Sequence, residues 1–190
     1  MINVTETYLP DEKKIMDMFG PLWKTKFITN RGPYVRQLEN ELKNRFKNPN
    51  VLITTNGTLA LQMAIRLLPR GEIITTSFSY IATTSSIMWE GYTPVFVDIN
   101  PINFNIDVNK IEKAITSSTR AILATHVFGI PCNIEAIDSI AKKFQLKVIY
   151  DAAHCFDVRY KDESIFSFGD ISICSFHATK LFHTAEGGGI

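Results

Sequence analysis

Hydrophobic residues along the chain follow two alternating patterns, one typical of helices and one typical of strands. Helical spacing is clearest at Tyr34, Leu38, Leu42 and Phe46, which fall on one side of a helix. Short apolar runs predict six strands, at Val51–Thr54, Glu72–Ser77, Pro94–Asp98, Ala121–Thr125, Lys147–Tyr150 and Ile171–Cys174. Strands that alternate with helices predict an α/β fold, with a mostly parallel sheet flanked by helices and right-handed crossovers.

Helix boundaries are marked by capping residues and glycines. The segment Leu59–Leu68 is apolar nearly all round, which predicts a buried helix. Another helix is expected to run through Trp89 and to end at Gly91, while Asp107 and Asn133 are expected to cap two later helices.

The first 33 residues have the pattern of an arm more than that of a core element. Asp11 is expected to cap a short helix, and residues 27–33 form a turn-rich loop. In the helix that starts at Tyr34, the polar side that carries Arg36, Glu39 and Lys43 is expected to face solvent.

Composition excludes several classes of protein. An apolar fraction of 45% and a charged fraction of 21% are ordinary for a globular protein, and a net charge of +1 gives no indication of nucleic-acid or membrane binding. The three cysteines, Cys132, Cys155 and Cys174, indicate reduced, buried thiols of a cytosolic protein, and no pair of them has the spacing of a metal site. The sequence shows neither a signal peptide nor an apolar run long enough to cross a membrane.

One lysine follows the last predicted strand and precedes a run of glycines. Lys180 thus lies in a loop at a strand end, where α/β proteins often place their chemistry. A lysine there can be a nucleophile that forms an imine with an aldehyde cofactor. The alternative is an ordinary solvated lysine, which is far more common for an isolated loop lysine.

Two further stretches hold candidate ligands for such a cofactor. Asn56-Gly57-Thr58 lies between a strand and a helix, where free backbone N–H groups and the helix dipole favour an anion, although a structural turn explains the same pattern. Asp151 ends a strand and can pair with a pyridinium nitrogen, or it can cap a helix. Tyr80 can stack on a ring or belong to the core, and Ser175 lies close enough to Lys180 to bind the same phosphate.

Together these stretches resemble the DegT/DnrJ/EryC1/StrS family of sugar aminotransferases, which are fold-type I enzymes that use pyridoxal 5'-phosphate. The resemblance covers the whole chain, and the order and spacing of its motifs are far more specific than any one of them. The matching stretches are Thr29-Asn30-x-Gly32-Pro33, Asn56-Gly57-Thr58-x-Ala60-Leu61, Pro94-Val95-Phe96-Val97-Asp98, His126-x-Phe128-Gly129-x-Pro131, Asp151-Ala152-Ala153-His154, Ser175-Phe176-His177-x-Thr179-Lys180 and Glu186-Gly187-Gly188.

The resemblance implies a role for each candidate residue. Lys180 is the expected Schiff-base lysine and proton carrier, and Asp151 is the expected partner of the pyridine nitrogen. The expected phosphate ligands are Gly57, Thr58 and Ser175, and the expected stacking aromatic is Tyr80. His154 stands near the ring oxygen, where many members carry glutamine. Residues 34–190 are expected to form the large cofactor-binding domain, after an arm at 1–33.

Within the family, the motif variants look most like enzymes that aminate position 4 of dTDP-4-keto-6-deoxyglucose. Such a cytoplasmic homodimer would use glutamate as amino donor, and its product, dTDP-4-amino-4,6-dideoxyglucose, would serve surface polysaccharide such as the O-antigen of lipopolysaccharide. One alternative is amination at another sugar carbon, and another is a non-catalytic homologue or an inactive remnant. Sugar dehydration is disfavoured, because those relatives replace the lysine with histidine, whereas this chain has Lys180.

The resemblance also predicts that these residues are an incomplete unit. Family chains are roughly twice as long, with a strand from the Gly187 segment inserted between earlier strands, and then a small C-terminal domain. We therefore expect a gap or unpaired edges in the sheet, partial exposure of the Leu59–Leu68 helix, marginal stability and no activity for residues 1–190 alone.

Overall fold

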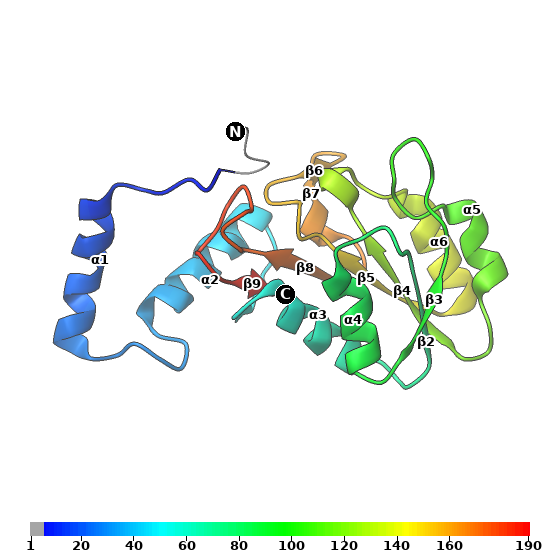
Figure 1. The fold of residues 1–190 in the computed structure, drawn as a ribbon, viewed down its shortest axis with the longest axis horizontal. Helices are drawn as coiled ribbons and strands as arrows, with labels where there is room; N and C mark the ends of the chain where they lie inside the picture. Colours follow the sequence, from blue (N-terminus) through cyan, green and yellow to red (C-terminus); the bar gives the residue numbers. More distant parts are fainter. Residues whose placement is uncertain (1–5) are drawn as a thin grey trace.

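The computed structural model describes residues 6–190, which form a seven-stranded sheet with helices on both faces (Figure 1). The strand order is β1 (Ile53–Thr54), β9 (Gly188–Gly189), β8 (Ile171–Ser175), β5 (Lys147–Asp151), β4 (Thr119–Thr125), β2 (Glu72–Thr75) and β3 (Thr93–Phe96). Strands β8, β5, β4, β2 and β3 are parallel to their neighbours in this series, whereas β9 is antiparallel to both β8 and β1. The predicted α/β class with a mostly parallel sheet is confirmed.

Helices α3 (Gly57–Arg66) and α4 (Ile81–Trp89) cover one face of the sheet. Their buried side chains pack on alternate residues of β2, β4, β5 and β8, as the two-residue period of a strand requires. The prediction of a buried helix is wrong in part, and the expected partial exposure of the Leu59–Leu68 segment is found. Leu59, Met63 and Leu67 are exposed by 38%, 36% and 74%, because a spacing of four residues places all three on the side away from the sheet.

Helices α2 (Pro33–Phe46) and α6 (Ile134–Phe144), with the short α5 (Val108–Ile111) and the 3₁₀ turn Glu112–Ala114, lie on the other face. The predicted caps are confirmed: the Asp107 carboxylate accepts the Asn109 N–H, and the Asn133 side chain accepts the Ala136 N–H, both at 3.1 Å. Gly91 follows the end of α4 in the left-handed region, at φ 76°.

The expected solvent exposure of Glu39 is wrong, since only 1% of this residue is exposed. Its carboxylate accepts two hydrogen bonds from the Arg31 guanidinium, at 2.8 and 2.5 Å, and one from the backbone N–H of Ile53 in β1, at 3.3 Å. A buried carboxylate needs such donors to offset its lost hydration. These contacts anchor the loop before α2 to the edge of the sheet.

The expected gap in the sheet is also absent. Strand β9 fills the position between β8 and β1, with Gly188 opposite Ser175 and Thr54, and Gly189 opposite Cys174 and Ile53. Two further backbone hydrogen bonds between Leu52 and Ile190, at 2.9 and 3.0 Å, extend the ladder. The two glycines of β9, together with the Leu52–Ile190 pair, therefore connect β1 to the rest of the sheet.

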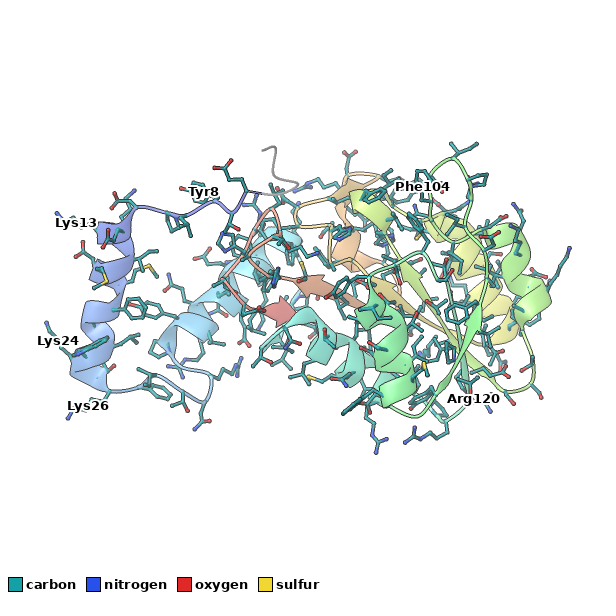
Figure 2. All side chains as sticks on the ribbon, in the orientation of Figure 1. Tyr8, Lys13, Lys24, Lys26, Phe104 and Arg120 are labelled. Carbon is teal, nitrogen blue, oxygen red and sulfur yellow. The ribbon has the colours of Figure 1, made fainter. Side chains whose placement is uncertain are left out.

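Helix α1 (Glu12–Thr25) stands apart from the three layers and has no buried residue (Figure 1). Asp11 caps it as predicted, accepting the Lys14 N–H at 3.1 Å, but at 14 residues the helix is longer than expected. Figure 2 shows Lys13, Lys24 and Lys26 at the outer edge of the molecule. No helix within residues 6–190 combines the length and apolar character that a membrane crossing requires.

A short hairpin and two 3₁₀ turns were not predicted. Strands β6 (Arg159–Tyr160) and β7 (Glu163–Ser164) are joined by Lys161 and Asp162, whose φ angles are 49° and 64°. Two successive positive φ angles are the backbone geometry of a tight hairpin turn, here without the usual glycine or asparagine signal. The turns are Val127–Gly129 and Ile165–Ser167.

Candidate active site

A cavity of about 560 Å³ lies at the carboxyl ends of β4, β5 and β8, where α3 and α4 begin. It brings together all seven residues that the sequence singled out, namely Gly57, Thr58, Tyr80, Asp151, His154, Ser175 and Lys180. A second cavity of about 520 Å³, between α2 and the β8–β9 part of the sheet, contains none of them. The first cavity is therefore the candidate site.

One wall of the cavity is a cradle formed by the start of α3 and the end of β8. The Asn56 side chain caps α3 by accepting the Leu59 N–H at 2.8 Å. The N–H groups of Gly57 and Thr58 lie in the first turn, where a helix has no internal acceptor for them. A Cβ on Gly57 would lie 3.2 Å from the Ser175 Cβ and 3.6 Å from its Oγ. The start of α3 and the Ser175 side chain thus lie close together, as an anion site formed by both requires.

Strand β9 supports this cradle from behind. A Cβ on Gly188 would lie 2.4 Å from the carbonyl carbon of Asn56 and 2.6 Å from the Gly57 nitrogen, which is closer than any real side-chain contact. The Asn56–Gly57 peptide therefore packs directly on the backbone of Gly188. The glycine run after Lys180 is a structural part of the site as well as a loop.

Asp151 lies on the cavity floor, with only 4% of the residue exposed. Its two oxygens have different donors. The backbone N–H of Ala153 donates to Oδ1 at 3.1 Å, and the hydroxyl of Thr83 donates to Oδ2 at 2.7 Å. These contacts hold a carboxylate at the end of β5, facing the space that a ring would occupy.

Lys180 is partly buried and His154 is more exposed in the same cavity, and burial is the largest cause of the pKa shift of each. Burial lowers the pKa of Lys180, although the negative charge of Asp151 opposes this shift. Burial also lowers the pKa of His154, with a further contribution from the positive charge of Lys180. Lys180 therefore reaches the neutral, nucleophilic form more readily than an exposed lysine does.

Tyr80 lies at the rim of the cavity, at the N-cap position of α4, and 75% of the residue is exposed. Its carbonyl accepts the Thr83 N–H at 3.1 Å, which begins the helix. The ring is thus free to cover a ligand that enters the cavity.

Two threonines near Asp151 were missed by the sequence analysis. Thr83 reaches Asp151 from α4, and Thr125 lines the cavity from the residue of β4 that pairs with Asp151. Thr125 is 7% exposed, and its hydroxyl has no hydrogen-bond partner among residues 6–190. Thr125 follows an apolar run at a predicted strand end, the same signal that identified Asp151, but its hydroxyl alone suggested no chemistry.

The residues present fit pyridoxal phosphate. The cradle offers donors for a phosphate, Asp151 offers a fixed negative charge for a ring nitrogen, and Lys180 offers an amine. The unpartnered hydroxyl of Thr125 is a buried polar group that a bound polar ligand would satisfy.

Comparisons with known proteins agree with this geometry. The profile of the DegT/DnrJ/EryC1/StrS aminotransferase family matches residues 10–190. A relative from Shigella dysenteriae, dTDP-4-amino-4,6-dideoxy-D-glucose transaminase, is 45% identical over 190 residues, which are 100% of this chain and 52% of the relative. GDP-perosamine synthase from Escherichia coli O157:H7 is 36% identical over 165 residues, which are 85% of this chain and 45% of that protein.

A solved structure gives the same result. The aminotransferase PseC from Helicobacter pylori, which is involved in the biosynthesis of pseudoaminic acid, superimposes with a TM-score of 0.90 at 31% identity, covering 98% of this chain and 51% of that one. The chain thus spans about half the length of the curated relatives it matches.

Proposed function

The chain belongs to the DegT/DnrJ/EryC1/StrS aminotransferase family, and we propose that it forms the cofactor-binding part of a pyridoxal-phosphate-dependent sugar nucleotide aminotransferase. The observation that carries this proposal is the convergence of Lys180, Asp151 and the Gly57–Ser175 cradle in one cavity. In this assignment residues 34–190 are the large domain and residues 1–33 are an arm.

Each residue has a binding or proton-transfer task in this proposal. The N–H groups of Gly57 and Thr58 and the hydroxyl of Ser175 hold the phosphate, and the ring of Tyr80 covers one side of the pyridine ring. His154, whose pKa is lowered by burial, offers a neutral imidazole to the ring oxygen. Pyridoxal phosphate, when bound, supplies an electron-withdrawing ring that stabilises negative charge on the substrate carbon.

Asp151 and Lys180 carry the chemistry of the chain itself. The Asp151 carboxylate keeps the ring nitrogen protonated, and its two donors hold it in place for this task. Lys180 would hold the cofactor through its side-chain amine, and its Nζ would carry the proton of the substrate carbon. Its lowered pKa favours the neutral amine that both tasks need.

We infer the substrate class from the relatives. The proposed reaction is amination at position 4 of dTDP-4-keto-6-deoxyglucose, with glutamate as donor, in a cytoplasmic homodimer that serves O-antigen and lipopolysaccharide biosynthesis. The 45% identity to the Shigella enzyme favours this substrate. Amination of a different nucleotide-activated sugar is the second candidate, favoured by the 36% identity to GDP-perosamine synthase.

Borohydride trapping tests the central assignment. The full-length protein is incubated with pyridoxal phosphate, reduced and digested, and we expect the phosphopyridoxyl group on the peptide that contains Lys180. Lys180→Ala should lose both the label and amino transfer to keto sugar nucleotides. A label on a different lysine would refute the assignment. Transfer assays with dTDP- and GDP-linked 4-keto sugars then separate the two substrate candidates.

A further inference from the structure

Asp151 has a buried side-chain partner that comes from a distant part of the chain. The Thr83 hydroxyl donates to Asp151 Oδ2 at 2.7 Å, and the two residues are 0% and 4% exposed. Within residues 6–190 this is the only hydrogen bond between two side chains of which both are buried. It links the first turn of α4 to the end of β5.

The hydroxyl of Thr83 is directed away from its own helix. A threonine inside a helix commonly donates to a backbone carbonyl three or four residues earlier. Thr83 Oγ1 donates to the carboxylate instead, while the Thr83 N–H makes the bond to the Tyr80 carbonyl at 3.1 Å. The Thr83 backbone thus makes a hydrogen bond of the helix, and its side chain makes the hydrogen bond to Asp151.

The two donors to Asp151 together fix its orientation. With the Ala153 N–H on Oδ1 at 3.1 Å and the Thr83 hydroxyl on Oδ2, each oxygen accepts one bond from a different element. A carboxylate held at both oxygens cannot turn about its last side-chain bond without breaking one of them. Each oxygen keeps a second lone pair for another donor.

Thr83 also fixes the position of one wall of the cavity relative to its floor. It lies one turn after Tyr80, the N-cap residue of α4, and next to Ala82, which lines the cavity. The bond from Thr83 to Asp151 therefore sets the start of α4, with Tyr80 on it, relative to the floor of the site.

We propose that Thr83 is a positioning residue, which orients Asp151 so that this carboxylate can hold a protonated ring nitrogen. This inference rests on the proposed function, since it concerns how the carboxylate serves a bound pyridine ring. Without the hydroxyl, Asp151 keeps only the Ala153 N–H as a donor, and its carboxylate is less firmly fixed in the orientation that faces the ring.

The test compares three variants of the protein reconstituted with pyridoxal phosphate. Thr83→Val removes the hydroxyl at nearly constant volume, and Thr83→Ser keeps it. The matched control is Thr75→Val, because Thr75 is a fully buried threonine at the end of β2 whose hydroxyl has no partner among residues 6–190. Each variant is measured for cofactor affinity, for kcat of amino transfer, and for the ¹⁵N chemical shift of the ring nitrogen in labelled cofactor.

We expect Thr83→Val to lower kcat by roughly 10- to 100-fold, the factor that one hydrogen bond to a charged group represents. The ¹⁵N signal should move towards that of a neutral ring nitrogen, and the pH at which the visible absorption band changes should move with it. A purely structural role would not move these spectra. Thr83→Ser should restore the wild-type signal, and Thr75→Val should match the wild type throughout.

Two results would overturn the inference. One is a folded Thr83→Val protein whose ring-nitrogen signal and kcat equal those of the wild type, and the other is a Thr83→Ser protein as impaired as Thr83→Val. If Thr83→Val does not fold, Thr83→Ala replaces it and is compared with Thr83→Ser in the same way. A wild-type protein that does not bind the cofactor at Lys180 would instead refute the proposed function, and this inference with it.

Discussion

The close contact between β9 and the phosphate cradle allows a sharp prediction about Gly188. In Gly188→Ala the new Cβ would lie 2.4 Å from the Asn56 carbonyl carbon, 2.5 Å from its oxygen and 2.6 Å from the Gly57 nitrogen. Carbon atoms in favourable contact are about 3.5–4.0 Å apart, so the turn or the strand must move by roughly 1 Å. Both are backbone segments held by hydrogen bonds, and neither can rotate away as a side chain would.

Gly188→Ala is expected to lower both the stability of the protein and its affinity for the cofactor. Overpacking of this kind costs about 1–3 kcal/mol, and for a chain of this size that lowers Tm by roughly 2–12 °C. Because the displaced turn carries the N–H groups of Gly57 and Thr58, affinity for pyridoxal phosphate should fall at least about tenfold, which corresponds to about 1.4 kcal/mol. Thermal unfolding by circular dichroism and cofactor titration by absorbance measure the two effects.

Gly189 provides the matched control, since it is the adjacent buried glycine in the same two-residue strand. A Cβ there would lie 3.4 Å from ring atoms of Phe176 and 3.7 Å from the Leu52 carbonyl oxygen, which is ordinary contact. Gly189→Ala should therefore keep the wild-type Tm and cofactor affinity. If the two variants behaved alike, the direct packing of β9 against the cradle would be refuted.

Three further predictions concern the floor of the cavity and the lysine. Asp151→Asn should fold but transfer amino groups about 10²–10³-fold more slowly in single-turnover assays, because a neutral amide cannot balance the charge of a protonated ring nitrogen. A near-normal rate would contradict the assignment. Thr125→Val should weaken cofactor binding by roughly 5- to 10-fold, the effect of losing one ordinary hydrogen bond, and an unchanged dissociation constant would show that its hydroxyl contacts no bound ligand. Burial lowers the pKa of Lys180, and an amine is neutral above its pKa. Covalent capture of pyridoxal phosphate should therefore rise with pH around a midpoint below 10.5, the ordinary lysine pKa. A midpoint at or above 10.5 would refute the lowered pKa.

Local sequence signals predicted the parts of the fold that depend on neighbouring residues. Asn133 and Asp107 cap helices because their short polar side chains reach an N–H two or three residues ahead, within the same segment. The strand that ends at Asp151 was identified by its apolar run. Ser175 was selected for its closeness to Lys180 in the sequence, and the structure brings it together with Asp151 in one cavity.

Contacts between distant segments could not be predicted in the same way. Glu39 has the spacing of a solvent-facing residue, and its burial depends on Arg31, whose backbone is left-handed at φ 60°, and on Ile53. Thr83 lies on helix α4, in which apolar and polar residues are not clearly separated onto two sides. Only the structure shows that its hydroxyl donates a hydrogen bond to Asp151. In both cases a polar group is buried because a partner elsewhere in the chain satisfies it.

The position of β9 has a consequence for how the protein is synthesised and folds. Among the strands of residues 6–190, β1 pairs with β9 alone, although most of the sheet lies between them in the sequence. During synthesis, α3 and its cap therefore emerge long before the glycine backbone against which they must rest. Such long-range pairing is slow to form, because the entropy of closing a large loop is lost before the contact is gained. We therefore expect the cradle to be among the last regions of this sheet to gain protection in pulse-labelled hydrogen exchange, so that cofactor binding reports the completion of the sheet.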